Sequence, residues 1–209
     1  MADRLSLYDY LAFVVPGAMI LFVAVYGYDG WPRGEPGVAG TVALTAASFV
    51  VGYINAALGN WLQPMFLGGK PGGRADSLWG TLGACSHYTD AERDRFTRML
   101  TDRYDDLPPG AGFHLAYTEL QQRGLDGPLV LMNQHIGFTR GTATATAVGL
   151  TIDIGLALTS GTHLPLVVWG PILLSAMVPF VMRYRRFWRR FGDQVLRGIY
   201  VLPDASGGS

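Results

Sequence analysis

The sequence predicts an all-α membrane protein with four transmembrane helices, a small helical cytoplasmic insert and an amphipathic C-terminal helix. Of its 209 residues, 49% are apolar and only 15% are charged, and the mean hydropathy is +0.22, which is high for a soluble protein. Four segments approach the roughly 20 apolar residues that a helix needs to cross a bilayer. These segments contain no basic residue, and they span 10–28, 39–62, 141–160 and 164–182.

Residues 1–62 form the first helix pair in this interpretation. The first span follows Arg4 and has the apolar character of a signal peptide, but no small-x-small cleavage site comes after it. Aromatic residues typical of a membrane interface follow it instead, namely Tyr26, Tyr28 and Trp31. We therefore expect a retained anchor that is kinked at Pro16.

Residues 63–125 are expected to form a cytoplasmic linker and a helical insert. The stretch "LGGKPGGRADS" contains too many Gly and Pro residues for a helix. It is not a phosphate loop, because Pro71 follows Lys70 where such a loop needs Ser or Thr. It is therefore interpreted as a linker.

Two amphipathic helices are predicted in the insert. Thr89 and Glu92 form a capping box at the start of the first helix, and Pro108 and Pro109 end it. Apolar residues recur at helical spacing in both segments, at Phe96, Met99, Leu100, Tyr104 and Leu107, and then at Phe113, Ala116, Tyr117 and Leu120. Because the insert is too small for a large core of its own, we expect it to bury this face against membrane helices or a neighbouring subunit.

Residues 126–182 are expected to contain one long helix and then the fourth span. No strong helix breaker occurs between Asp126 and Gly161, so the helix begins in the cytoplasm and continues as the third span. Fourteen of the 16 basic residues lie in 63–140 or after 182. By the positive-inside rule, both termini and the insert face the cytoplasm.

Polar and small residues share one face of the third span, and the second span has a similar stripe. The members are Thr142, Thr146, Gly149, Asp153 and Ser160 in the third span, and Ser48, Gly52 and Asn55 in the second. At about 1.5 Å rise per residue, Asp153 lies at nearly the same depth as Ser48, so Ser48 is the expected hydrogen-bond partner rather than Asn55.

Two interpretations of Asp153 remain open at the level of the sequence. It is either a protonated group bonded to hydroxyls between packed helices or part of a polar ring that lines an ion path in an oligomer.

The C-terminal segment 183–203 is predicted to be an amphipathic helix rich in arginine. Its apolar residues recur every four positions, at Phe187, Phe191, Val195 and Ile199. The arginines are candidates for binding lipid or a phosphate-bearing ligand or oligonucleotide, and they are Arg183, Arg185, Arg186, Arg189 and Arg190. Residues 204–209, "DASGGS", resemble a linker or tag remnant.

No catalytic motif is present in the sequence, so neither enzymatic activity nor a catalytic residue is expected. Cys85 and His87 lack a second local pair of zinc ligands, so neither a metal nor a cofactor is expected. The single cysteine excludes an intrachain disulfide.

Three stretches, "LYDYLAFVVPGAMIL", "NQHIGFTRGTATA" and "RYRRFWRRF", resemble those of small multi-span bacterial inner-membrane proteins of the predicted anti-phage defence effector type. The resemblance implies location in the bacterial inner (plasma) membrane and an effector that permeabilises this membrane when signalled. It transfers no functional residue, because no defining motif is shared.

The leading hypothesis is an oligomeric inner-membrane channel or pore-forming effector that is gated through its cytoplasmic helices. Its expected partners are membrane lipids, further copies of the chain, and a cytoplasmic nucleotide, oligonucleotide or protein signal. The alternatives are a non-conducting membrane scaffold that recruits a cytoplasmic partner, and a small transporter, although no inverted repeat is evident in the four spans.

Overall fold

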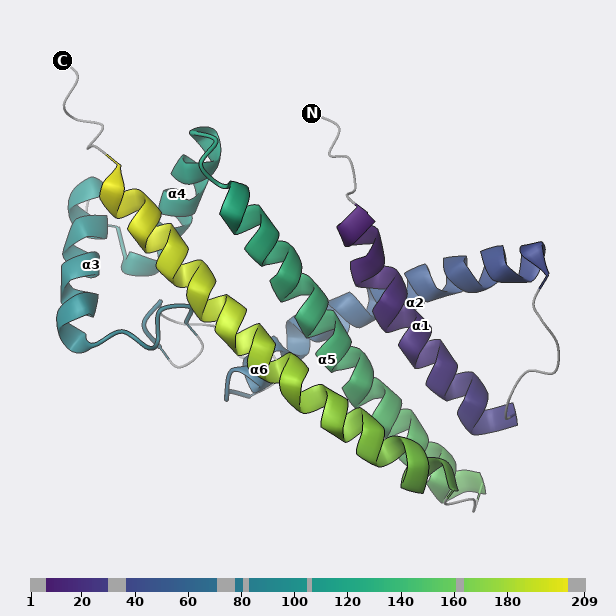
Figure 1. The fold of residues 1–209 in the computed structure, drawn as a ribbon. Coiled ribbons are helices and arrows are strands. Elements are labelled where there is room, and N and C mark those ends of the chain that lie inside the picture. The colour runs from purple at the N-terminus through teal and green to yellow at the C-terminus, as the bar shows by residue number, and fades with distance from the viewer. Residues whose placement is uncertain are drawn as a thin grey trace. The chain divides into compact units, whose positions relative to one another are not determined.

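The computed structural model describes residues 7–29, 37–70, 78–80, 83–104, 107–160 and 164–202, with side chains described at 10–25, 37–70, 78–80, 83–104, 107–159 and 170–202 (Figure 1). Residues 204–209 and the first interhelical loop at 30–36 lie outside this part. Every element in the described ranges is an α-helix, which confirms the all-α class. The helices are α1 (Leu7–Asp29), α2 (Val38–Phe66), α3 (Asp90–Arg103), α4 (Pro109–Gln122), α5 (Gly127–Ser160) and α6 (Leu164–Val201).

The chain divides into two compact units. Unit 1 consists of residues 1–63 and 136–184, and unit 2 consists of residues 64–135 and 185–209. The helices α2, α5 and α6 each continue from one unit into the other. We describe each unit by itself.

Two described helices are long and apolar enough to cross a membrane, Val38–Phe66 and Gly127–Thr159. This is fewer than the four spans predicted from the sequence. The apolar part of α1 with described side chains, Tyr10–Val25, is shorter than a full span. The expected fourth span begins in 160–169, whose side chains lie outside the described part. The long helix predicted from Asp126 to Ser160 is confirmed, since α5 covers 34 residues.

In unit 1, α1 and α2 cross with their backbones almost in contact. A Cβ atom on Gly17 would lie 1.8 Å from the carbonyl oxygen of Ser48, and one on Gly52 would lie 1.9 Å from that of Phe13. Only glycine leaves room for such an approach. The aromatic ring of Phe49 also packs against Tyr10 and Phe13, with ring centroids 5.9 and 5.7 Å apart, and secures the same crossing.

The centre of unit 1 is the part of α5 that contains 141–146, where six consecutive residues are buried. Residues on all sides of a helix can be buried only when other helices surround it. Gly141 lies beside Pro16 of α1 and Asn55 of α2, and Gly149 lies beside Leu173 of α6. The other three helices of unit 1 therefore enclose α5.

In unit 2, the capping box predicted at the start of α3 is confirmed. The backbone N–H of Glu92 donates to the Thr89 hydroxyl at 3.4 Å, and the N–H of Thr89 donates to the Glu92 carboxylate at 2.9 Å. The second helix begins earlier than predicted, because Pro109 occupies the first turn of α4, where its missing N–H costs nothing.

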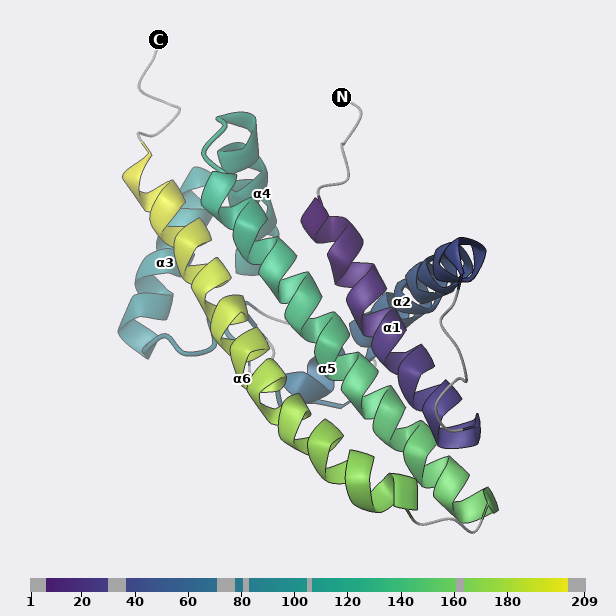
Figure 2. The same ribbon diagram turned by 45° about the vertical axis from the view of Figure 1, so that its right-hand side comes forward.

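The second half of α6 completes the core of unit 2 (Figures 1 and 2). Val195, Leu196 and Ile199 are at most 1% exposed and pack with α3, α4 and the segment 83–88. The insert therefore buries its apolar face against the C-terminal half of α6 in the same chain. The apolar face of 183–203 is correspondingly covered by protein. The fully buried members of this core are Cys85, Leu100, Ala116, Val195 and Leu196.

A charged cluster joins α3 to α4 beside this core. The guanidinium of Arg103 donates two hydrogen bonds to the carboxylate of Glu119, at 2.7 and 3.1 Å, and the Tyr104 hydroxyl donates a third at 2.8 Å. Arg123 forms an ion pair with the same carboxylate at 2.6 Å. The bonds from Arg103 lower the pKa of Glu119 from its ordinary value of 4.5 to about 2, although partial burial opposes them.

The α1–α2 crossing predicts that Gly52→Ala destabilises the protein. The added methyl group would overlap the Phe13 carbonyl, so the helices must separate. We expect a loss of about 1–3 kcal/mol, the usual cost of overpacking, seen as a lower melting temperature of the purified protein in detergent. Gly155→Ala is the matched control, since nothing lies within 4 Å of a Cβ there. Equal melting temperatures of the two variants would contradict the close crossing.

Glu119→Gln is expected to destabilise unit 2 at neutral pH by about 1–3 kcal/mol, because the charged hydrogen bonds are weakened. The pKa of Glu119 is lower in the folded state than in the unfolded state, so its stabilisation is complete above pH 4.5 and is lost as the pH falls toward about 2. Thermal melts from pH 7 to pH 3 should show a weaker acid dependence for this variant. Asp94→Asn, at an exposed residue of α3, should leave the profile unchanged.

Candidate functional site

The threonines of the α5 stripe direct their hydroxyl groups back to their own helix. The Thr142 hydroxyl donates to the Phe138 carbonyl at 2.9 Å, and the Thr146 hydroxyl donates to the Ala143 carbonyl at 2.8 Å. Both side chains are buried. Because a hydroxyl has one proton to donate, neither is available as a donor to another side chain.

Gly149 and Asp153 continue the stripe, and the surroundings of Gly149 are apolar. A Cβ atom on Gly149 would lie 3.4 Å from a methyl carbon of Val23 and 3.5 Å from one of Leu173. Asp153 comes one helical turn later on the same face. Ser160, the last predicted member of the stripe, ends α5, and its side chain lies outside the described part of the chain.

Asp153 is buried without a hydrogen-bond partner among the described residues. Its side chain is 1% exposed, and neither carboxylate oxygen accepts a hydrogen bond from a described group. The hydrogen bond expected from Ser48 is therefore absent, although Ser48 is itself buried. An ionised carboxylate that is buried without a partner carries a large desolvation cost. Asp153 must consequently be neutral, or it must meet water or an ion.

The α2 stripe divides between two neighbours. Ser48 and Gly52 lie against α1, through the close crossing described above. Asn55 faces α5, where its amide donates to the Gly141 carbonyl at 2.8 Å. One turn later, a Cβ on Gly59 would lie 3.1 Å from the Thr144 hydroxyl.

Arg140 was missed as a member of this polar interface. Its guanidinium donates to the side-chain oxygen of Gln63 at 2.9 Å, which ties α5 to the end of α2 in unit 1. Only Arg140, Asp153 and Arg183 are charged among the described side chains of unit 1. The position of Arg140 immediately before a long uncharged run was the signal in the sequence.

The five arginines of the C-terminal segment are all exposed. Arg183 belongs to unit 1 and the other four belong to unit 2. The Nε–H of Arg185 donates to the backbone carbonyl of Phe66, at the end of α2. No described carboxylate lies within ion-pair distance of Arg185, Arg186, Arg189 or Arg190.

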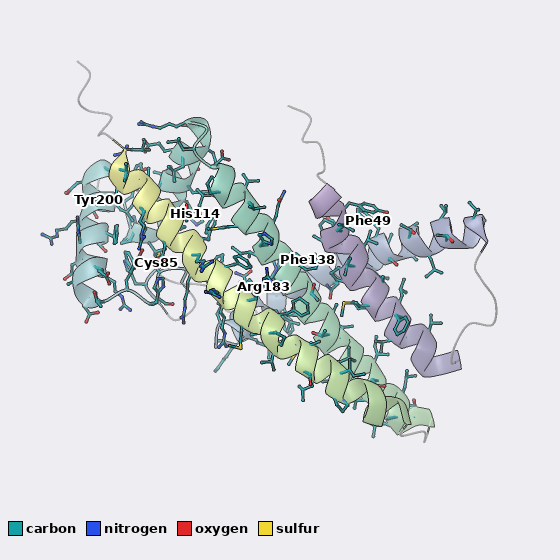
Figure 3. All side chains as sticks on the ribbon, in the orientation of Figure 1. Phe49, Cys85, His114, Phe138, Arg183 and Tyr200 are labelled. Atoms are coloured by element: carbon teal, nitrogen blue, oxygen red, sulfur yellow. The ribbon has the colours of Figure 1, made fainter. Side chains whose placement is uncertain are left out.

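Cys85 and His87 have separate roles in unit 2. Burial, together with the nearby charge of Asp193, raises the pKa of the Cys85 thiol to about 12, so it carries no thiolate at neutral pH. Figure 3 shows Cys85 beside α6. The Nε2 atom of His87 lies 3.0 Å from a carboxylate oxygen of Asp193. This pair attaches the segment 83–88 to α6.

No family model, curated protein or solved structure matches this chain. The functional argument therefore depends on the residues and their geometry.

Proposed function

We propose that this chain is a subunit of an oligomeric channel or pore-forming effector in the bacterial inner membrane. In this proposal α1, α2, α5 and the first half of α6 cross the membrane, and both termini lie in the cytoplasm. The observation that carries the proposal is Asp153, a buried carboxylate with no hydrogen-bond partner among the described residues.

A purely structural role accounts poorly for Asp153. A packing group in an apolar span gains stability only when its polar atoms are paired, and an uncharged residue would avoid the desolvation cost. The hydroxyl groups of its stripe that the structure describes, at Thr142 and Thr146, already donate to backbone carbonyls. Ionisable groups inside membrane spans typically belong to ion or proton pathways, which supports assigning Asp153 to a conducting path.

The apolar surface of unit 1 supports its placement in lipid. In the most apolar 18-residue stretch of α2, only 22% is buried, so large apolar side chains are exposed on its outer face. Exposed apolar surface of this extent is typical of a protein that contacts lipid or another copy. The exposed residues of α2 include Val38, Val42, Leu44, Val50, Tyr53, Ile54, Trp61 and Met65.

Gating through unit 2 is part of the proposal. Val23 and Leu173 close over the stripe at Gly149, so conduction requires these side chains to move apart. Because α2, α5 and α6 continue from unit 1 into unit 2, a signal that binds unit 2 acts on the helix that carries Asp153 and on two other helices of unit 1.

The second candidate is a non-conducting scaffold. Two observations favour it. The chain completes the core of unit 2 with its own residues Val195, Leu196 and Ile199. Four arginines of α6 are exposed and have no ion-pair partner among the described residues. Such an arrangement suits a module that recruits an acidic partner. Co-purification of a stoichiometric partner, with no ion flux, would favour this candidate.

Labelling of single cysteines in intact cells tests the topology. In a Cys85→Ala background, a cysteine introduced at Gly37 should react with a membrane-impermeant maleimide from outside, because 29–38 is the proposed exterior loop. A cysteine at the exposed Gln122 should react only after permeabilisation. Reaction of the Gln122 variant in intact cells would overturn the orientation.

Ion flux through liposomes containing the purified protein tests the role of Asp153. Asp153→Asn removes the ionisable group at nearly constant shape, so it should change conductance or ion selectivity and abolish any pH dependence, while leaving assembly intact. Thr151→Ala is the control in the same helix, since Thr151 is exposed and bonded only to the Ala147 carbonyl. Size analysis in nanodiscs should show the same oligomer for all three proteins.

The outcome separates the two interpretations of Asp153. If Asp153→Asn leaves flux, selectivity and pH response unchanged, Asp153 is a neutral packing group and the ion-path role is excluded. A strictly monomeric particle that conducts nothing would exclude the channel itself.

A further inference from the structure

We propose that unit 2 contains a pocket that binds a single phosphate group between α6 and the turn at 83–86. The pocket has a volume of about 50 Å³. The residues that line it come from three parts of unit 2, and they are Leu67, Gly83, Ser86, Arg185, Trp188 and Arg189.

The donors of this pocket match the chemistry of a phosphate. Arg185 and Arg189 are one helical turn apart, so both guanidinium groups reach the same place. Neither forms an ion pair with a described carboxylate. Ser86 adds a hydroxyl that makes no hydrogen bond to any described group. Two guanidinium groups and a hydroxyl provide several N–H and O–H donors for the oxygen atoms of one anion.

The walls of the pocket are held in place before any ligand binds. Arg185 is oriented by the bond from its Nε–H to the Phe66 carbonyl, which leaves its terminal N–H groups available. Arg93 donates to the Ser86 carbonyl at 3.0 Å and so fixes the turn. The His87–Asp193 pair binds the same segment to α6 and also engages a nearby acidic group that would repel an anion. A preformed site loses little entropy on binding.

The size of the pocket limits what it can enclose. Pockets that enclose an organic ligand usually measure about 300–1,000 Å³, several times the volume here. One small anionic group of a ligand fits into the pocket, and the rest of that ligand must remain outside it. Arginine pairs favour phosphate because planar guanidinium groups bind two of its oxygens at once.

The position of the pocket in the chain favours a lipid as the source of the phosphate. Leu67 follows the last residue of α2, and Arg185 follows the proposed fourth span. In the proposed topology both mark the level at which the chain leaves the hydrocarbon, where lipid phosphates lie. Trp188, which also lines the pocket, is a residue type enriched at that level. The lipid source rests on the proposed membrane placement, whereas the phosphate pocket itself does not depend on ion conduction.

Native mass spectrometry of the full-length protein in detergent tests the site with two lipids, phosphatidylglycerol and diacylglycerol, which lacks a phosphate. The wild-type protein should retain phosphatidylglycerol in preference to diacylglycerol. Arg189→Gln should reduce this retention roughly tenfold, the loss expected for one charge-assisted contact. Arg190→Gln is the matched control, since it removes the same charge from an exposed arginine outside the pocket. It should leave retention nearly unchanged.

A second measurement separates the sources of the phosphate. Inorganic phosphate is titrated into the same variants and followed by their melting temperatures, which also report whether each variant is folded. One informative result is that phosphate raises the melting temperature of the wild-type protein and of Arg190→Gln but not that of Arg189→Gln, while the wild-type protein shows no preference for phosphatidylglycerol. This result would support the pocket and indicate that its ligand is a soluble phosphate. If Arg189→Gln and Arg190→Gln retain phosphatidylglycerol equally and respond equally to phosphate, the phosphate site is excluded. The arginines would then form only a general positively charged surface.

Discussion

The pairing of polar groups inside an apolar helical unit is the constraint on which the structure of unit 1 depends. Where no water is available, each hydroxyl or amide must find a partner nearby. The threonines of α5 bond to carbonyls of the preceding turn, and Asn55 bonds to the backbone of Gly141. The bond from Asn55 of α2 to the Gly141 carbonyl of α5 requires that the two helices lie close together, which small residues permit. Single atoms of Asn55 and Arg140 are also left unpaired among the described residues, but Asp153 leaves both carboxylate oxygens unpaired, and the functional proposal follows from that carboxylate.

The second constraint is that α6 serves two environments with one continuous helix. Its first half belongs to the apolar unit, and its second half supplies Val195, Leu196 and Ile199 to the core of unit 2. Burial of these residues turns the arginines toward solvent. The same helix thereby fixes Arg185 and Arg189 next to the turn at 83–86. The helical repeat of α6 thus places its apolar residues in the core of unit 2 and its arginines beside the phosphate pocket.

The two proposals depend on different features. Conduction depends on Asp153 in unit 1, and phosphate binding depends on side chains that all belong to unit 2. If both hold, a phosphate bound beside α6 has a direct physical means of influencing the spans, because α6 belongs to both units. Binding to one state of this helix more tightly than to another would shift the population of open channels.

Local features of the chain were determined by the sequence alone. The helical class, the extent of α5, the capping box at Thr89 and most apolar positions of α3 and α4 follow from spacing and local bonding, which act within a few residues, whereas α3 ends at Arg103 and leaves the predicted Leu107 exposed beyond it. Tertiary structure decided which face meets which neighbour. Asn55 rather than Ser48 bonds to α5, and the backbone of Ser48 lies against Gly17 of α1 at the glycine crossing. The apolar face of the C-terminal half of α6 packs into the core of unit 2, which periodicity could not tell, because periodicity specifies that a face is buried but carries no information about what covers it.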